Sequence, residues 1–259
     1  MVTQAATPIV ALRGVAKAFA SGMMALEDFD LAVRPGEFLT LLGPSGCGKS
    51  TALRLIASLS EPTRGTIEWS DGGTRADQIG FVFQEPTLMP WASVSANVHL
   101  PLKLAGIGRE EAAPRIGEAL ASVGLTAFAP AYPRELSGGM KMRVSIARAL
   151  VTKPDLLLMD EPFAALDEIT RFKLNNDLLA LWQALGKTVI FVTHSVFESV
   201  YLSSRIVVIT SRPGRVFKEL VIDAPQPRTE TFRTSAEYAG YCRVASEMLA
   251  GAMAAGATA

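Results

Sequence analysis

The stretch that most constrains the fold is a strand, a glycine-rich loop and a helix in direct succession. The apolar run FLTLL, residues 38–42, has the length of a strand, and the helix-compatible run TALRLIASL begins at residue 51. Between them, the glycine-rich residues 43–51 (GPSGCGKST) fit the pattern G-x-x-x-x-G-K-[ST]. Such a loop turns backbone N–H groups toward a phosphate, and the following helix points its positive end there. We therefore expect an α/β fold that binds a nucleotide.

The loop motif assigns expected roles to its residues. Lys49 is expected to reach the β- and γ-phosphates, and the hydroxyl of Ser50 to bind Mg²⁺. The other nucleotide-binding positions are expected to supply the loop backbone: Gly43, Pro44, Ser45, Gly46, Cys47, Gly48 and Thr51. Cys47 is either a reactive thiol at the helix start or a small buried side chain.

Composition excludes two broad classes of protein. Hydrophobic residues make up 49% of the 259 residues and charged residues only 19%, so the chain is not expected to be disordered. The 25 Lys and Arg balance the 25 Asp and Glu. This balance argues against a nucleic-acid partner, because binding along many phosphates usually needs a basic excess.

The chain is apolar, with a mean hydropathy of +0.27, yet no membrane span is expected. Its apolar runs, such as residues 156–159 and 188–193, are far shorter than the roughly 20 residues that cross a bilayer. The N-terminal residues also lack the pattern of a signal peptide. The apolar composition therefore suggests a surface that partners cover. Two cysteines, of which one lies in the loop, favour a reducing cytoplasm.

Short apolar runs alternate with helix-compatible stretches, which favours a mostly parallel sheet with helices on both faces. Strands are expected at residues 9–15, 26–33, 38–42, 79–83, 156–159, 188–192 and 205–210, with an edge strand over 216–222. The expected fold class is α/β, with a mostly parallel sheet core, antiparallel edge strands and an inserted α-helical subdomain. The resemblance of residues 43–50 to a P-loop implies the P-loop NTPase (RecA-like) type. The expected limits are a core at about 8–84 and 154–225, a helical subdomain at about 85–153, and a C-terminal linker and helix at 226–259 whose last residues, GAMAAGATA, fray.

A second motif, PDLLLMDEP, places two carboxylates at the end of a buried strand. Asp160 is expected to hold Mg²⁺, and Glu161 to polarise a water near the γ-phosphate. A strand that ends in Asp-Glu would elsewhere be solvated charge. The phosphate loop upstream favours the functional interpretation.

A third motif, ELSGGMKMRVSIARAL, opens an amphipathic basic helix with Ser137, Gly138 and Gly139. This start is a second anion-binding helix end, although the chain already has a complete loop at residues 43–51. Two such ends in one small domain suggest that each grips a different nucleotide. We therefore expect the chain to work as a head-to-tail pair.

With these motifs in this order, residues 8–222 resemble the nucleotide-binding subunit of an ATP-binding cassette (ABC) transporter. The resemblance implies four further roles. Phe19 stacks on adenine, and Gln84 senses Mg²⁺ and the attacking water. Asp167, in AALD, lies in the loop that crosses the dimer seam, and His194 is the switch histidine beside the γ-phosphate. The family usually has an acidic residue after that histidine; here Ser195 follows, and we expect less local negative charge without loss of hydrolysis.

The form LSGGM is similar to the importer branch for nitrate, sulfonate, taurine and related solutes. The resemblance implies ATP and Mg²⁺ as ligands and a second copy and membrane permease subunits as partners, with a solute-binding protein engaged indirectly and a place at the cytoplasmic face of the plasma membrane. An ABC or P-loop ATPase that is not coupled to transport is the alternative. Leu88, Met89 and Trp91 either pack inside the helical insert or form a groove for a permease helix.

Overall fold

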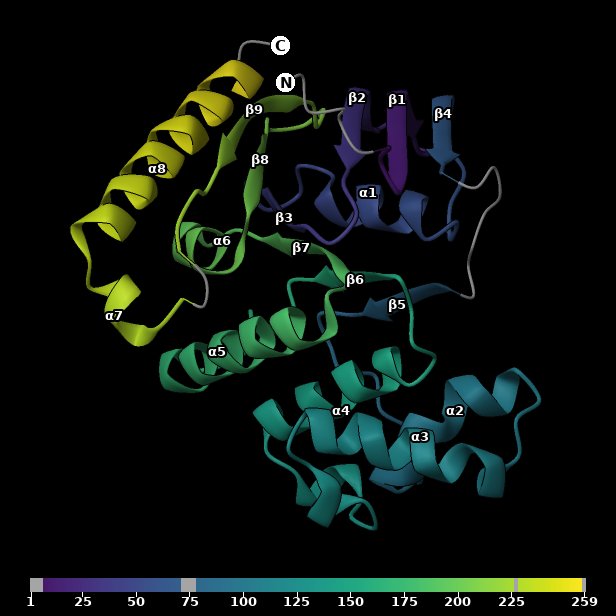
Figure 1. Ribbon diagram of the computed structural model, residues 1–259. Helices are drawn as coiled ribbons and strands as arrows, with labels where there is room; N and C mark the ends of the chain where they lie inside the picture. The colour runs from purple at the N-terminus through teal and green to yellow at the C-terminus, as the bar shows by residue number, and fades with distance from the viewer. Residues whose placement is uncertain (1–6, 71–77, 226–227, 258–259) are drawn as a thin grey trace. The chain divides into compact units, whose positions relative to one another are not determined.

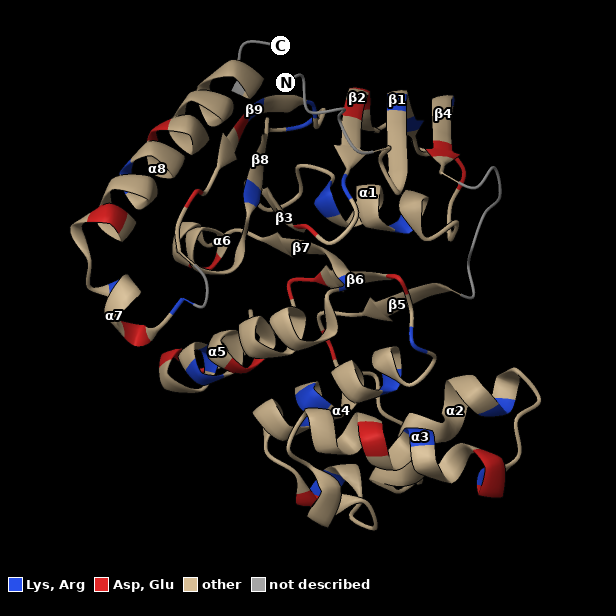
Figure 2. Cartoon of the chain, in the orientation of Figure 1, with Lys and Arg blue, Asp and Glu red and all other residues tan. Residues whose placement is uncertain are grey.

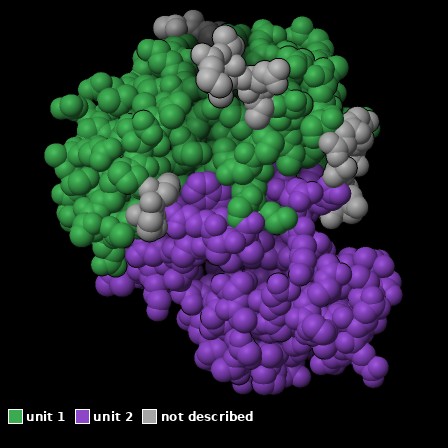
Figure 3. Space-filling view, viewed as in Figure 1, with its two compact units in different colours: residues 1–76, 186–259 green, residues 77–185 purple. Residues whose placement is uncertain are grey.

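The computed structural model describes residues 7–70, 78–225 and 228–257 (Figure 1). Two compact units make up the chain (Figure 3). Unit 1 comprises residues 1–76 and 186–259, and unit 2 comprises residues 77–185. The expected helical subdomain, about 85–153, falls inside unit 2, and its limits stay a prediction.

Unit 1 contains a three-stranded antiparallel sheet in the order β2-β1-β4. Its strands are β1 (Val10–Ala18), β2 (Met24–Val33) and β4 (Arg64–Trp69). β4 was not among the expected strands. Its side chains are exposed or only partly buried along its whole length, so its sequence carries no apolar run. Pairing with β1, with Val10 opposite Trp69, creates the strand instead.

Unit 1 also contains the buried parallel strands that the apolar runs predict. β7 (Thr188–Thr193), β3 (Phe38–Leu42) and β8 (Arg205–Ile209) pair in parallel, and every residue of the three is buried. β9 (Val216–Val221) pairs with β8 in the antiparallel direction, after the turn at residues 211–215. The expectation of parallel strands with an antiparallel edge strand is therefore confirmed in this unit.

The helices of unit 1 are α1 (Lys49–Ile56), α6 (Val196–Leu202), α7 (Glu230–Arg233) and α8 (Ala236–Ala257). The expected fraying of the C-terminal residues is wrong for residues 251–257, which are helical. Tertiary contact explains the difference: Ala252 is fully buried, and Gly251 lies close to the ring of Phe217 on β9. A small residue at position 251 thus permits packing that composition alone does not reveal.

Unit 2 places two parallel strands, β5 (Ile79–Val82) and β6 (Leu156–Asp160), with a group of helices. The helices are α2 (Val94–Leu104), α3 (Arg109–Ser122), α4 (Gly138–Leu150) and α5 (Glu168–Leu185), and two short 3-10 turns lie at Thr126–Phe128 and Pro133–Glu135. Buried apolar residues of α2, α3 and α4 share one core, which includes Val98, Leu120 and Val144.

Among the described residues, no helix is both long enough and apolar enough to span a membrane. Charges of both signs are distributed along α5 and α8 (Figure 2).

Candidate functional site

The phosphate loop joins β3 to α1 in unit 1, and its geometry requires a glycine at position 48. Gly48 is the N-cap residue of α1, with φ of 101°, a conformation that residues with a Cβ rarely adopt. A Cβ there would lie 2.6 Å from the carbonyl oxygen of Ala25 and 2.7 Å from Cδ2 of Leu26. The helix start can therefore approach β2 this closely only because the side chain is absent.

Lys49 is buried inside the loop, at 3% exposure. Its Nζ donates to the backbone carbonyls of Gly43 at 2.9 Å and Pro44 at 2.8 Å. The ammonium group is thus held where the loop backbone converges, which suits the predicted contact with phosphates. Cys47 is also buried, and burial raises the pKa of its thiol despite the nearby Lys49. A buried filler therefore describes Cys47 better than a reactive thiolate does.

Arg212 contacts the phosphate loop and was missed in the sequence, where residues 211–215 read only as a turn. Its Nε and Nη2 donate to the carbonyl oxygen of Gly46 at 3.2 and 3.0 Å. Its Nη1 contacts Sδ of Met23 at 3.0 Å, in the β1–β2 turn. The backbone N–H of Phe19 closes the same turn by donating to the Met23 carbonyl. Arg212 thus links the predicted adenine platform, Phe19, to the phosphate loop.

His194 follows β7 directly and is exposed. Because β7 pairs in parallel with β3, with Thr193 opposite Leu42, His194 and Gly43 leave neighbouring strands at the same edge of the sheet. The structure therefore brings the predicted switch histidine and the phosphate loop to one edge of unit 1.

Side chains on both sides of His194 tie its loop together. The hydroxyl of Thr193 donates to Oε2 of Glu198 at 2.5 Å, and it accepts from the backbone N–H of Ser195 at 3.0 Å. The Ser195 hydroxyl in turn accepts from the N–H of Glu198 at 3.3 Å, which caps α6. Ser195, which departs from the family pattern, thus has a local structural role.

In unit 2 as well, predicted site residues follow two neighbouring parallel strands at one edge. β5 and β6 pair in parallel, with Val82 opposite Met159, so Gln84 and Asp160 come at the same edge of the pair. Glu161 follows with φ of 43°, a left-handed conformation that is uncommon outside glycine. The backbone turns sharply where β6 ends, immediately at the carboxylate that the sequence assigns to water activation.

The third motif begins α4 in unit 2 and lies against the start of α5. Ser137 is the N-cap residue of α4, and its hydroxyl accepts from the N–H of Met140 at 3.3 Å. A Cβ on Gly139 would approach Cγ2 of Thr170 to 2.9 Å, so the two helix starts are in close contact. Asp167 accepts from the N–H of Thr170 at 2.9 Å, and the hydrogen bonds from Thr170 lower the pKa of its carboxyl. The structure therefore places Asp167 next to the motif at Ser137 to Gly139.

Two residues that the sequence did not single out fix the loop that follows Gln84. Arg148, near the end of α4, donates to the carbonyls of Pro86 and Thr87 at 2.7 and 2.9 Å. The fully buried amide of Asn97 accepts from the N–H of Met89 at 2.7 Å and donates to carbonyls between Met89 and Ser93. The loop backbone is thus held from both ends. A loop without a periodic pattern gives no sign of which polar side chains bind its backbone, which is why both were missed.

The same loop divides the apolar cluster at residues 88–91. Leu88 packs against the core of unit 2, whereas Trp91 is 77% exposed. Internal packing therefore accounts for Leu88 but not for Trp91.

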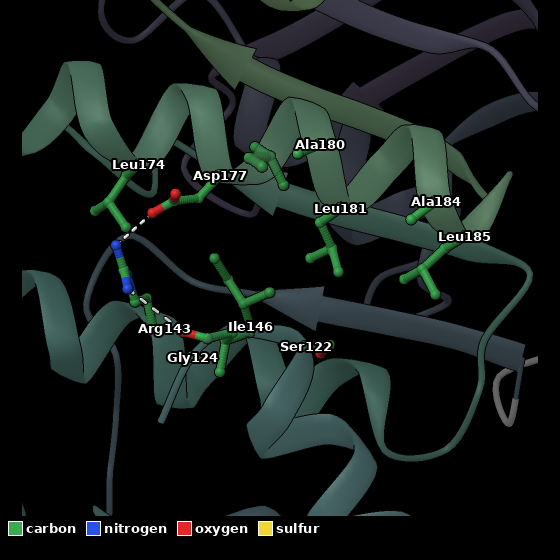
Figure 4. A pocket seen from close by; sticks show the side chains of 12 residues that line it. Ser122, Gly124, Arg143, Ile146, Leu174, Asp177, Ala180, Leu181, Ala184 and Leu185 are labelled. Carbon is green, nitrogen blue, oxygen red and sulfur yellow. Dashed lines mark hydrogen bonds and ion pairs between the residues drawn. The ribbon is translucent and has the colours of Figure 1, made fainter. Parts of the chain in front are cut away.

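A separate hollow of about 400 Å³ lies in unit 2 between α4, α5 and the end of α3 (Figure 4). Its walls are mostly aliphatic, with Ile146 and Leu181 among them. Arg143 pairs with Asp177 at one side (Figure 4). None of the predicted site residues lines this hollow, so it is not part of the candidate site.

The predicted residues therefore fall into two groups. Unit 1 contains Phe19, the phosphate loop and His194, and unit 2 contains Gln84, Asp160, Glu161, Ser137, Gly138, Gly139 and Asp167. The predicted Mg²⁺ ligands are a hydroxyl, an amide and a carboxylate, from Ser50, Gln84 and Asp160. All offer oxygen, the donor atom that Mg²⁺ prefers, so the residues fit that ion.

Comparison with known proteins finds relatives over most of the chain. The family described as "ABC transporter" matches residues 26–164. A nitrate import ATP-binding protein of Synechocystis sp. is 44% identical over 239 residues, or 88% of this chain and 89% of the relative. An aliphatic sulfonates import ATP-binding protein of Bacillus licheniformis is 44% identical over 221 residues, or 83% and 85%. A solved ATP-binding cassette, a dimeric post-hydrolysis state bound to ADP and Pi, matches with a TM-score of 0.73 at 35% identity, over 83% of this chain and 100% of that one.

Proposed function

The chain belongs to the ABC transporter family, and on that premise we propose that it is the ATP-hydrolysing subunit of an importer for a small solute. Two relatives that align over most of both chains are named import ATP-binding proteins, one for nitrate and one for aliphatic sulfonates. Both cargoes are small and anionic, so the proposed solute is a sulfonate, nitrate or a related small molecule. The name of neither relative favours an ATPase that is uncoupled from transport.

One observation carries the proposal of a paired ATPase. The helices α1 and α4, one in each unit, begin directly after or at a glycine. Gly48 precedes α1 in unit 1, and Ser137 and Gly138 begin α4 in unit 2. We propose that two copies bind two ATP molecules, each between residues 43–51 of one copy and residues 137–139 of the other. A helix start suits anionic phosphates because its N–H groups lack partners within the helix. A likeness to a dimeric cassette that holds ADP and Pi supports this arrangement.

The chemistry assigned to each residue follows from its functional group. Lys49 places a buried positive charge at the phosphates, and Glu161 orients the attacking water, with His194 beside the γ-phosphate. Ser50, Gln84 and Asp160 would hold Mg²⁺. When bound, the ion would neutralise part of the phosphate charge. Closure on ATP can do work only through contacts that ADP does not make, so hydrolysis reopens the pair.

The surface around Trp91 is proposed to receive a cytoplasmic helix of a membrane permease. Trp91 projects from a loop whose backbone Asn97 and Arg148 hold in place, so the indole is displayed on a fixed support. A large exposed aromatic side chain is typical of an interface anchor. The same loop begins two residues after Gln84, so nucleotide sensing and permease contact would share one segment. The chain would then act at the cytoplasmic face of the membrane, attached through the permease.

Trp91→Ala tests this coupling surface. Because Trp91 is exposed and is not one of the residues proposed to contact the nucleotide, the purified variant is expected to keep the basal ATPase rate and the melting temperature of the parent protein. Loss of an interface anchor costs about 2 kcal/mol or more, so solute uptake by the reconstituted complex should fall at least ~10-fold. Solute uptake is measured in proteoliposomes, and the ATPase rate is measured in detergent. Leu104→Ala, which removes another exposed apolar side chain of the same unit, is the matched control; equal loss in both variants, or no loss in Trp91→Ala, contradicts the surface.

The proposed solute class is tested by reconstituting this chain with a permease and a solute-binding protein that assemble with it. In proteoliposomes, ATP hydrolysis should rise when the binding protein carries a sulfonate or nitrate, and should stay basal with an uncharged solute of similar size. Stimulation by the uncharged solute alone would overturn the anion proposal while leaving the importer intact. Stimulation by none, with no uptake, would favour the uncoupled ATPase.

A further inference from the structure

Arg228 is a buried arginine, at 5% exposure, that lies outside every motif of the chain. Its Nη1 donates to the backbone carbonyls of Val200 at 3.1 Å and Tyr201 at 2.8 Å, and its Nη2 to that of Ile222 at 3.4 Å. Burial lowers the pKa of Arg228 to about 10, so the guanidinium stays charged at neutral pH. A buried charge whose hydrogen bonds go to backbone carbonyls is held there for a structural purpose.

Two of the three carbonyls that Arg228 binds, those of Val200 and Tyr201, belong to the last turn of α6. The final four carbonyls of a helix have no partner within the helix, and that end carries partial negative charge. Val200 and Tyr201 lie in this turn, because α6 ends at Leu202. Arg228 therefore caps the C-terminal end of α6 with a full positive charge.

More contacts join the same helix to the segment that follows Arg228, here called the C-terminal arm and defined as residues 228–238. The hydroxyl of Tyr238 donates to the carbonyl of Phe197 at 3.0 Å, at the start of α6. Burial raises the pKa of Tyr238, so the phenol keeps its proton and remains a donor. The guanidinium of Arg233 lies 3.7 Å from the ring centre of Tyr201. The arm thus holds α6 at both ends, and α8, whose first residues belong to the arm, packs against α6.

α6 starts at the loop of His194. Val196 is its first residue, and the hydroxyl of Ser195 caps it. Glu198, one turn along, accepts the hydroxyl of Thr193 on the other side of His194. A shift of α6 therefore moves both attachments of the histidine loop. The two ends of α6 connect Arg228 with the edge of the sheet where His194 and Gly43 emerge.

From these contacts we infer that Arg228 is a positioning residue for His194: the C-terminal arm fixes α6, and α6 fixes the loop that presents the histidine. This inference rests on the proposed function, in which His194 acts beside the γ-phosphate. The arm is thus a part of the hydrolytic apparatus that lies outside the motifs of the family. Its sequence, RTETFRTSAEY at residues 228–238, carries none of the chemistry itself.

Arg228→Met tests the inference in the full-length chain, with Arg243→Met as the matched control. Arg243 is an exposed arginine of α8, and the same exchange there removes a charge without touching α6. In Arg228→Met, kcat for ATP hydrolysis is expected to fall about 5-fold while KM for ATP stays within about 2-fold, because a positioning group affects the reaction more than nucleotide binding. Arg228→Lys keeps the charge but loses the planar fork of N–H donors, so its kcat should lie between those of Arg228→Met and the parent protein. Arg243→Met should match the parent protein.

A spectroscopic readout separates positioning from general loosening of the fold. The chain has only two histidines, His99 and His194, so the imidazole region of a histidine NMR spectrum holds two sets of signals. His99 lies in unit 2, where its Nε2 is 3.1 Å from the carbonyl of Ile107, and serves as an internal reference. Arg228→Met should move the His194 signals and leave those of His99 in place. Arg243→Met should move neither.

Two results would overturn the inference. One is a folded Arg228→Met protein with the parental kcat and His194 signals; the other is a lower kcat with His194 signals that do not move. If Arg228→Met does not fold, Tyr238→Phe replaces it, because it removes only the hydroxyl that binds Phe197; the same two results then decide. Failure of the proposed function is distinct: the parent protein would show no ATPase activity, or His194→Ala would not reduce it, whereas the NMR comparison would still report whether Arg228 positions the loop.

Discussion

Replacing Glu161 by Gln is expected to lower ATP hydrolysis by about 100-fold or more, the usual effect of removing a general base. Binding of MgATP should be retained, because Lys49 and the loop backbone remain. If ATP joins two copies, a variant that cannot complete hydrolysis accumulates in the closed pair. We therefore expect Glu161→Gln to be a monomer without nucleotide and a dimer with MgATP. Light scattering after gel filtration measures the mass, and phosphate release measures the rate.

The control for this prediction is Glu118→Gln, an equal exchange at an exposed carboxylate that pairs with Lys153. Exposed ion pairs contribute little to stability, so this variant should hydrolyse ATP and change mass as the parent protein does. A Glu161→Gln protein that stays monomeric at saturating MgATP contradicts the shared nucleotide site. Hydrolysis that continues at the parental rate removes Glu161 from the proposed chemistry.

Replacing Gly48 by Ala is expected to abolish nucleotide binding and to lower the free energy of unfolding by about 2–4 kcal/mol. About 1–2 kcal/mol comes from forcing a residue with a Cβ to a positive φ, and the remainder from the clash with the backbone carbonyl of Ala25, which cannot move without disturbing β2. Urea unfolding gives the stability, and fluorescence of a labelled ATP analogue gives the affinity.

Gly117→Ala is the matched control, since Gly117 lies inside α3 and an added Cβ there would enter open space. There the same added methyl group should raise the free energy of unfolding by about 0.5–1 kcal/mol, because alanine favours the helix. If Gly48→Ala is as stable as the parent protein or more stable, the loop tolerates a Cβ at position 48 and the prediction is wrong.

The sequence allowed prediction of the elements whose cause is local. The buried parallel strands read as apolar runs. The helix α4 begins at the predicted Ser-Gly-Gly start, and α1 follows the glycine-rich loop as expected, although it begins at Lys49, two residues before the expected run. The α/β class is confirmed by these strands and by the likeness to a solved cassette at 35% identity. The two ligand motifs could be placed at strand ends because parallel strands share an edge.

What the sequence did not predict depends on contacts between distant residues. β4 exists because β1 offers it an edge, and α8 extends to Ala257 because Gly251 packs on Phe217 of β9 and Gly256 lies close to Ser211. Arg212 reaches Gly46 across 166 positions of sequence. Arg148 and Asn97 satisfy carbonyls of a loop that no periodic pattern describes. The role of such side chains depends on the folded backbone around them, and their own sequence does not show it.

The left-handed backbone of Glu161 opposes stability to chemistry at a single position. A residue other than glycine at a φ of 43° carries a conformational penalty of about 1–3 kcal/mol, and glycine or asparagine would relieve much of it. An exchange of Glu161 for glycine is therefore expected to raise the free energy of unfolding while it removes the carboxylate. At this turn the side chain that suits the backbone best and the side chain proposed to orient water are different residues.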